Sequence, residues 1–98
     1  MKTKEILAKI QRHLGSLKEE YNVERLGVFG STVRGEQTSK SDVDILIDFS
    51  RPIGFFRFIQ LEGLLSKILK KKVDLVSRKA LKPAIRKNIL DEVVFVRE

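Results

Sequence analysis

Hydrophobic residues recur every three or four positions through the first part of the chain, at Ile6, Ile10, Leu14 and Leu17. This spacing is typical of one face of an amphipathic helix. It predicts a helix over residues 4–20, which the pair Tyr21-Asn22 brings to an end.

Short apolar stretches bounded by Gly, Ser, Asn or Pro follow this helix and predict strands. They cover residues 25–29, 43–49, 73–76 and 93–96. Between these strands, a wide apolar face predicts a long helix over residues 55–70. Pro83 suits the first turn of another helix over residues 83–90. A short helix is expected over residues 31–35, with Ser31 as its N-cap, and a polar loop over 36–41.

The predicted elements alternate as helix, strand, short helix, strand, helix, strand, helix, strand. Such alternation favours an α/β (α+β) fold. With 98 residues the chain is at the low end of the usual domain size. We therefore expect one domain over residues 1–98.

Composition narrows the chemistry that this domain can perform. The chain has no cysteine, which excludes disulfides, thiolate metal sites and cysteine nucleophiles. Its net charge of +7 favours polyanionic partners such as nucleotides, nucleic acids or acidic proteins. No signal peptide or membrane-spanning run is evident, so we expect a cytoplasmic protein without membrane contact.

Two aspartates lie at the start of the second predicted strand. Since residues two apart on a strand project from the same face, Asp42 and Asp44 point together, and Val43 and Ile45 point to the core. Such a pair either lies solvated on a half-exposed strand or binds a divalent cation such as Mg²⁺ between its carboxylates. Asp48 has the same parity, and we expect it on the surface.

Two further features favour a functional role for Asp42 and Asp44. Gly30-Ser31 ends a strand where a helix begins, and free backbone N–H groups and a hydroxyl at such a point can hold phosphate oxygens. Asp74 interrupts the apolar run of the third strand, where an unpaired charge would be costly. It is either a third member of an acidic site or the partner of a nearby lysine.

Gly30-Ser31, ten intervening residues and Asp42-Val43-Asp44 resemble the Gly-Ser-x10-Asp-x-Asp signature of the DNA polymerase β-like nucleotidyltransferase superfamily. The surrounding residues, including Arg34, resemble its minimal nucleotidyltransferase branch. The likeness covers nearly the whole chain. It implies a small mixed β-sheet flanked by helices, with Asp74 in the place of the third family carboxylate.

The resemblance implies transfer of a nucleotidyl group from a nucleoside triphosphate to a hydroxyl. Asp42, Asp44 and Asp74 would be the catalytic residues and would hold two Mg²⁺ ions, and Asp74 could accept the hydroxyl proton. Gly30 and Ser31 would bind the β and γ phosphates of the nucleotide. Arg34 either contacts phosphate or forms a structural ion pair.

Minimal members of this family are typically antitoxins encoded beside a HEPN-type RNase toxin, and some transfer AMP from ATP to a tyrosine of that toxin. The resemblance thus implies a protein adenylyltransferase with ATP as substrate and a HEPN-type toxin as partner. One alternative is an antitoxin that neutralises its toxin by binding alone. A second is a nucleic-acid-binding module, which would need exposed aromatics among its basic residues. The six phenylalanines are instead expected largely in the core.

Overall fold

The computed structural model describes residues 2–38 and 40–98, and its centre is one mixed β-sheet. Its four strands lie in the order β3-β2-β1-β4. β1 (Val23–Phe29) is antiparallel to β2 (Val43–Phe49) and to β4 (Val94–Phe95), whereas β2 is parallel to β3 (Val73–Ser77). The predicted α/β fold with a small mixed sheet is therefore confirmed.

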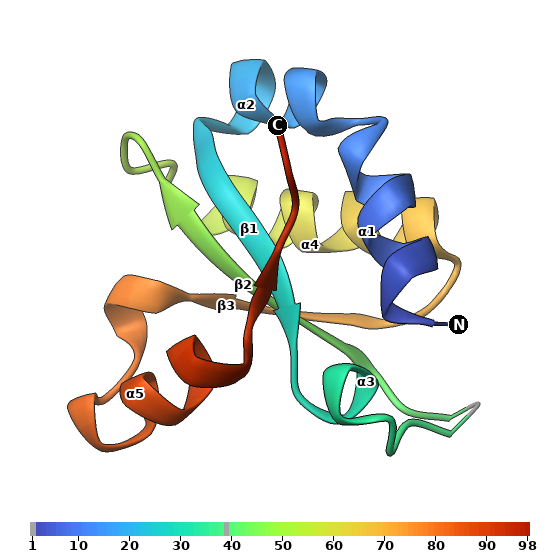
Figure 1. Cartoon of the computed structure of the whole chain (residues 1–98). Coiled ribbons are helices and arrows are strands. Elements are labelled where there is room, and N and C mark those ends of the chain that lie inside the picture. Colours follow the sequence, from blue (N-terminus) through green and yellow to red (C-terminus); the bar gives the residue numbers. More distant parts are fainter. Residues whose placement is uncertain (1, 39) are drawn as a thin grey trace.

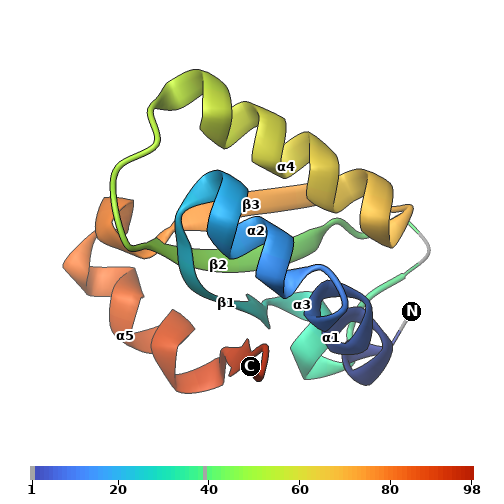
Figure 2. The same ribbon diagram turned by 90° about the horizontal axis from the view of Figure 1, so that it is seen from above.

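Helices cover both faces of this sheet (Figures 1 and 2). Because parallel neighbours cannot be joined by a tight hairpin, the long helix α4 (Phe55–Leu69) connects β2 to β3. It lies on one face of the sheet with α1 (Thr3–Gln11) and α2 (Leu14–Tyr21), and α5 (Pro83–Glu92) lies on the other. The short helix α3 (Ser31–Arg34) follows β1 directly, and a 3₁₀ turn (Arg78–Ala80) follows β3.

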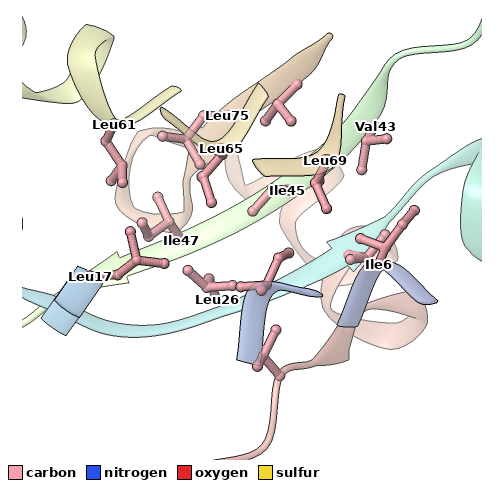
Figure 3. Close-up of a cluster of buried hydrophobic side chains, with 14 of the residues drawn as sticks. Ile6, Leu17, Leu26, Val43, Ile45, Ile47, Leu61, Leu65, Leu69 and Leu75 are labelled. Carbon is pink, nitrogen blue, oxygen red and sulfur yellow. The ribbon is translucent and has the colours of Figure 1, made fainter. Parts of the chain in front are cut away.

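Alternate residues of β2 divide between two hydrophobic cores. Val43, Ile45 and Ile47 are buried in the larger core beneath α1, α2 and α4, as Figure 3 shows for Ile45 and Ile47 beside Leu61 and Leu65. Leu46 points the other way, into a smaller core with Phe29 and Leu81 that α5 covers. The predicted alternation of this strand is thus confirmed. Asp44 projects to the same side of the strand as Leu46, which places it on the α5 face.

The single helix expected over residues 4–20 is wrong, because the structure has two helices separated at Arg12 and His13. His13 has φ −106° and ψ 0°, outside the helical region. Ile6, Ile10, Leu14 and Leu17 are nevertheless all buried in one core. The change of direction lets two short helices follow a twisted sheet that one straight helix would leave (Figure 1).

The expected core role of the phenylalanines is only partly right. Leu61, Leu65 and Leu69 of α4 are fully buried, but Phe55 and Phe56 in its first turn are 72% and 82% exposed. Neither of them belongs to the described hydrophobic cores, and their spacing along the helix alone could not show this.

Asp48 is buried rather than on the surface, which corrects the prediction. Its side chain is 5% exposed and lies between two arginines. Arg25 Nε donates to Oδ2 at 3.0 Å, and Arg78 Nε donates to Oδ1 at 2.8 Å. The carboxylate therefore joins β1, β2 and the segment after β3 at the end of the sheet opposite to Asp44.

We expect Asp48→Asn to lower the free energy of unfolding by about 1–3 kcal/mol, because both arginines lose a charged acceptor in a buried position. Urea denaturation measures this change. Glu19→Gln, at an exposed position of α2, is the control and should change stability by less than about 0.5 kcal/mol. Equal stability of Asp48→Asn and wild type would show that the two ion pairs contribute nothing.

Candidate active site

Three aspartates lie at one end of the sheet, hereafter the site edge, because of how its strands are paired. β1 ends at the edge where β2 and β3 begin, and Phe29, Asp44 and Asp74 lie side by side in register across the three strands. Asp42 immediately precedes β2, and the N–H of Val43 donates to the carbonyl of Lys72 next to β3 at 2.9 Å. The structure thus brings the predicted acidic residues to one place.

The three carboxylates differ in their surroundings. Asp44 is half-buried, whereas Asp42 and Asp74 are exposed. Lys72 Nζ lies 4.0 Å from Asp42 Oδ2 and is itself largely in solvent, so it compensates little charge. Within residues 2–38 and 40–98 Asp74 has no ion pair, and the alternative of a lysine partner for it is therefore wrong.

Gly30 forms the turn between β1 and α3 and touches Asp44. Its φ of +79° and ψ of −152° are open almost only to glycine. A Cβ atom at this position would lie 2.1 Å from Asp44 Oδ2. The turn therefore needs glycine for its conformation and for its distance to the carboxylate.

Ser31 is the first residue of α3 and not its N-cap, which corrects the prediction. Gly30 is the N-cap, because its carbonyl accepts the N–H of Arg34 at 3.2 Å and its own backbone is not helical. No side-chain cap bond is made, so the half-buried Ser31 has no capping role.

Glu92, the last residue of α5, is a member of this site that the sequence did not indicate. Its Oε1 accepts the N–H of Gly30 at 2.7 Å, and Arg34 Nη1 donates to both of its carboxylate oxygens at 3.1 Å. Arg34 Nε also donates to Glu36 Oε1 at 2.6 Å. Sixty-two residues separate Gly30 from Glu92, so only the packing of α5 against the sheet brings them together.

Arg34 is thus engaged in ion pairs in the free chain, one of the two roles considered for it. Hydrogen bonds to Glu36 and then to Glu92 raise the pKa of Arg34 above its usual value. It is a permanent cation beside an acidic group of residues.

A pocket of about 390 Å³ opens between this turn and α5. Its lining joins two carboxylates, one guanidinium and a backbone turn to apolar side chains of α5, and comprises Phe29, Gly30, Arg34, Asp44, Ile85, Asn88, Ile89 and Glu92. Asp42, Asp74 and Ser31 lie at the site edge outside this lining. A guanidinium and a backbone N–H therefore lie beside carboxylates at this place.

Negative charge at the site edge exceeds the positive charge that the chain supplies. Burial raises the pKa of Asp44 above its usual value, and the carboxylates of Asp74 and Asp42 raise it further against the opposing effect of Arg34. In the described part of the chain, no three His, Cys, Asp or Glu side chains are close enough to form a ready metal cage. Oxygen ligands with uncompensated charge fit a hard divalent cation that takes its remaining ligands from phosphate and water.

We predict that Asp44→Asn melts at a higher temperature than wild type at pH 7. Because the folded chain holds the Asp44 proton more tightly than the unfolded chain, wild-type stability falls as the pH rises through the raised pKa. The difference between the two proteins should shrink as the pH falls to about 3 and below, where this carboxyl is protonated in both states. Thermal melts at several pH values test this, and a difference that grows on acidification would contradict it.

We predict that Gly30→Ala loses about 1–3 kcal/mol of stability, because the positive φ is strained for alanine and its Cβ would displace Asp44. Gly63→Ala is the matched control. Gly63 is exposed inside α4 with open space around it, so alanine there should stabilise by about 0.5–1 kcal/mol. Denaturation of both variants gives the comparison, and equal effects at the two positions would contradict the close approach to Asp44.

The comparison with known sequences points in the same direction. The model of the nucleotidyltransferase domain family matches residues 10–96. The protein adenylyltransferase MntA of Thermococcus cleftensis is 46% identical over 92 residues, which span 94% of this chain and 93% of that protein.

Solved structures share the fold. A provisionally named minimal nucleotidyltransferase superposes with a TM-score of 0.79 at 31% identity, over 96% of this chain and 95% of that one. A toxin-antitoxin crystal structure with AMP-PNP gives 0.76 at 21% identity, over 93% and 72% of the chains. The complex of a tri-AMPylated HEPN toxin with its MNT antitoxin, from Shewanella oneidensis, gives 0.70 at 17%, over 97% and 71%. With the family match over nearly all of its length, this chain belongs to the nucleotidyltransferase domain family, and it is a nucleotidyltransferase.

Proposed function

We propose that this chain transfers AMP from ATP to a tyrosine hydroxyl of a HEPN-type toxin and so acts as its antitoxin. The observation that carries the proposal is the position of Asp44. It lies between Asp74 on the neighbouring strand and the turn at Gly30, where anion-binding groups begin. A metal-bound triphosphate needs carboxylates for its metal and hydrogen-bond donors for its phosphates, and both kinds of group lie here.

Residues of the turn would hold the phosphates. The Gly30 N–H, the Ser31 hydroxyl and the Arg34 guanidinium all lie at the β1–α3 turn, and a guanidinium gives planar, charge-assisted hydrogen bonds to phosphate oxygens. The adjoining pocket between this turn and α5 would take the rest of the nucleotide.

Asp42, Asp44 and Asp74 would hold magnesium, and the notable excess of negative charge around Asp44 supports this. When bound, two Mg²⁺ ions neutralise phosphate charge and favour an in-line displacement. Mg²⁺ is usually bound by one or two carboxylates together with substrate phosphates, so the nucleotide would supply the remaining ligands.

In the reaction, the acceptor oxygen forms a bond to the α-phosphorus of ATP while the bond to the β-phosphate oxygen breaks and pyrophosphate leaves. The proton of the acceptor hydroxyl passes to Asp74. Asp74 suits this role because it is exposed, so an acceptor can reach it, and because it is not committed to an ion pair within the described chain.

The proposed acceptor is a protein because the site is open. Asp42 and Asp74 lie on the surface beside the pocket, so a second molecule that docks over the site edge can present its hydroxyl directly. The names of the relatives support the choice of acceptor and partner, since one is a protein adenylyltransferase and one solved complex contains an AMPylated HEPN toxin. Since ATP is the substrate, we place the reaction in the cytoplasm.

The test is transfer of label from ATP to the HEPN-type protein encoded beside this chain, in the presence of Mg²⁺, with the modified residue located by mass spectrometry. The double variant Asp42→Asn, Asp44→Asn should lose at least about 1,000-fold in rate, because removal of several kcal/mol of charge stabilisation has that effect. It should still bind the toxin.

Asp91→Asn, one exposed charge removed from α5, is the control and should keep its activity. If the wild-type chain binds and silences the toxin without any transfer of label, the non-catalytic antitoxin is the correct account. If label goes to RNA instead, the acceptor assignment is wrong.

Asp74→Asn separates proton transfer from binding. We expect kcat to fall by about 10²–10⁴-fold while the affinity for the nucleotide changes little, as for the loss of a general base. The melting temperature should stay near that of wild type, because Asp74 is exposed. A variant that keeps its kcat would remove Asp74 from the reaction.

A further inference from the structure

The Glu92 carboxylate occupies both anion-binding groups of the site in the free chain. Its Oε1 accepts the Gly30 N–H at 2.7 Å, and both of its oxygens accept from Arg34 Nη1 at 3.1 Å. The side chain is only 27% exposed, so these bonds are partly shielded from water. A carboxylate in this position presents the same negative oxygens that a phosphate would present.

Glu92 and a phosphate cannot use these groups together. A backbone amide has one hydrogen and serves one strong acceptor, and two anions at hydrogen-bond distance from the same amide would repel each other. The repulsion would be greater here than elsewhere on the surface, because Glu92 already adds to the negative charge that raises the pKa of Asp44.

Glu92 can leave this position without disruption of the fold. It is the last residue of α5, and β4 begins two residues later and is held by β1 at Gly27 and Val28. α5 contains no fully buried residue, and Ile89 and Leu90 pack against the sheet only partly buried. Rotation of one glutamate side chain at a helix end therefore frees the amide and the guanidinium.

We propose that Glu92 is an internal competitor of the triphosphate. Its carboxylate stands in for a phosphate in the free chain, leaves Gly30 and Arg34 when ATP binds, and returns when pyrophosphate departs. This inference rests on the proposed function for the place of the phosphates. It adds a residue on α5 that weakens triphosphate binding and favours release of pyrophosphate.

Glu92→Gln tests the competition. Glutamine keeps the shape of the side chain but lacks the charge, so its bonds to Gly30 and Arg34 are weaker. We expect the affinity for AMP-PNP with Mg²⁺, measured by calorimetry, to rise about 5- to 50-fold, the factor for loss of a competing charge-assisted hydrogen bond. The affinity for AMP, which has no β or γ phosphate, should change less than about twofold on this account.

Glu36→Gln is the matched control, since Glu36 pairs with the same arginine but does not contact Gly30. It should change AMP-PNP affinity by no more than about twofold, the effect of one exposed ion pair. A second readout is the amide resonance of Gly30, which should move in Glu92→Gln without any ligand. In wild type it should also move on addition of inorganic tripolyphosphate.

The outcomes separate this inference from the proposed function. If wild type and Glu92→Gln bind AMP-PNP equally, Glu92 does not compete, and the function stands without it. If Glu92→Gln binds more weakly, Glu92 orients Arg34 for the phosphate and the competition is wrong. If neither protein binds AMP-PNP or tripolyphosphate, the proposed function falls and the competition with it.

Discussion

The feature on which the site depends is negative charge that the chain does not neutralise, held against one end of a mixed sheet. Asp44 cannot move away from Asp74, because the two residues are paired in register on parallel strands. It cannot turn toward β1 either, because Gly30 lies against its carboxylate. Burial and the neighbouring carboxylates therefore raise its pKa, and only Arg34 opposes them. This end of the sheet therefore keeps a negative charge that a bound metal ion would compensate.

The rest of the fold supplies the rigidity that this arrangement requires. β2 carries Ile45 and Ile47 into the core under α4 and Leu46 into the core under α5, so the strand that holds Asp44 is fixed on both faces. At its other end Asp48 is also buried, but there two arginines compensate the charge. β2 thus carries Asp48, whose charge two arginines compensate, and Asp44, whose charge stays largely uncompensated and is free to bind a metal ion or substrate.

The sequence was sufficient for the parts of the structure that depend on local spacing. The alternation along β2, the glycine after β1 and the position of Asp74 on the next strand all follow from patterns of a few residues, and the structure brings them together. Features that depend on the twist of the sheet or on distant contacts could not be predicted from the sequence. These features are the break at His13, the exposure of Phe55 and Phe56, the burial of Asp48 and the contact of Glu92 with Gly30. A carboxylate at the end of a helix looks like any solvated charge until the partner strand is known. The choice of the three aspartates as metal ligands stays a prediction.

The most direct measurement of the central claim is the place at which a metal and a nucleotide meet on the chain. Mn²⁺ can replace Mg²⁺ and broadens the resonances of nearby nuclei, so backbone amide spectra recorded with Mn²⁺ and AMP-PNP locate the metal. The account predicts broadening that is strongest at Gly30, Asp42, Asp44 and Asp74, falls off with distance from them, and depends on the nucleotide. Broadening centred elsewhere, or nucleotide binding at the site edge that needs no divalent cation, would contradict it.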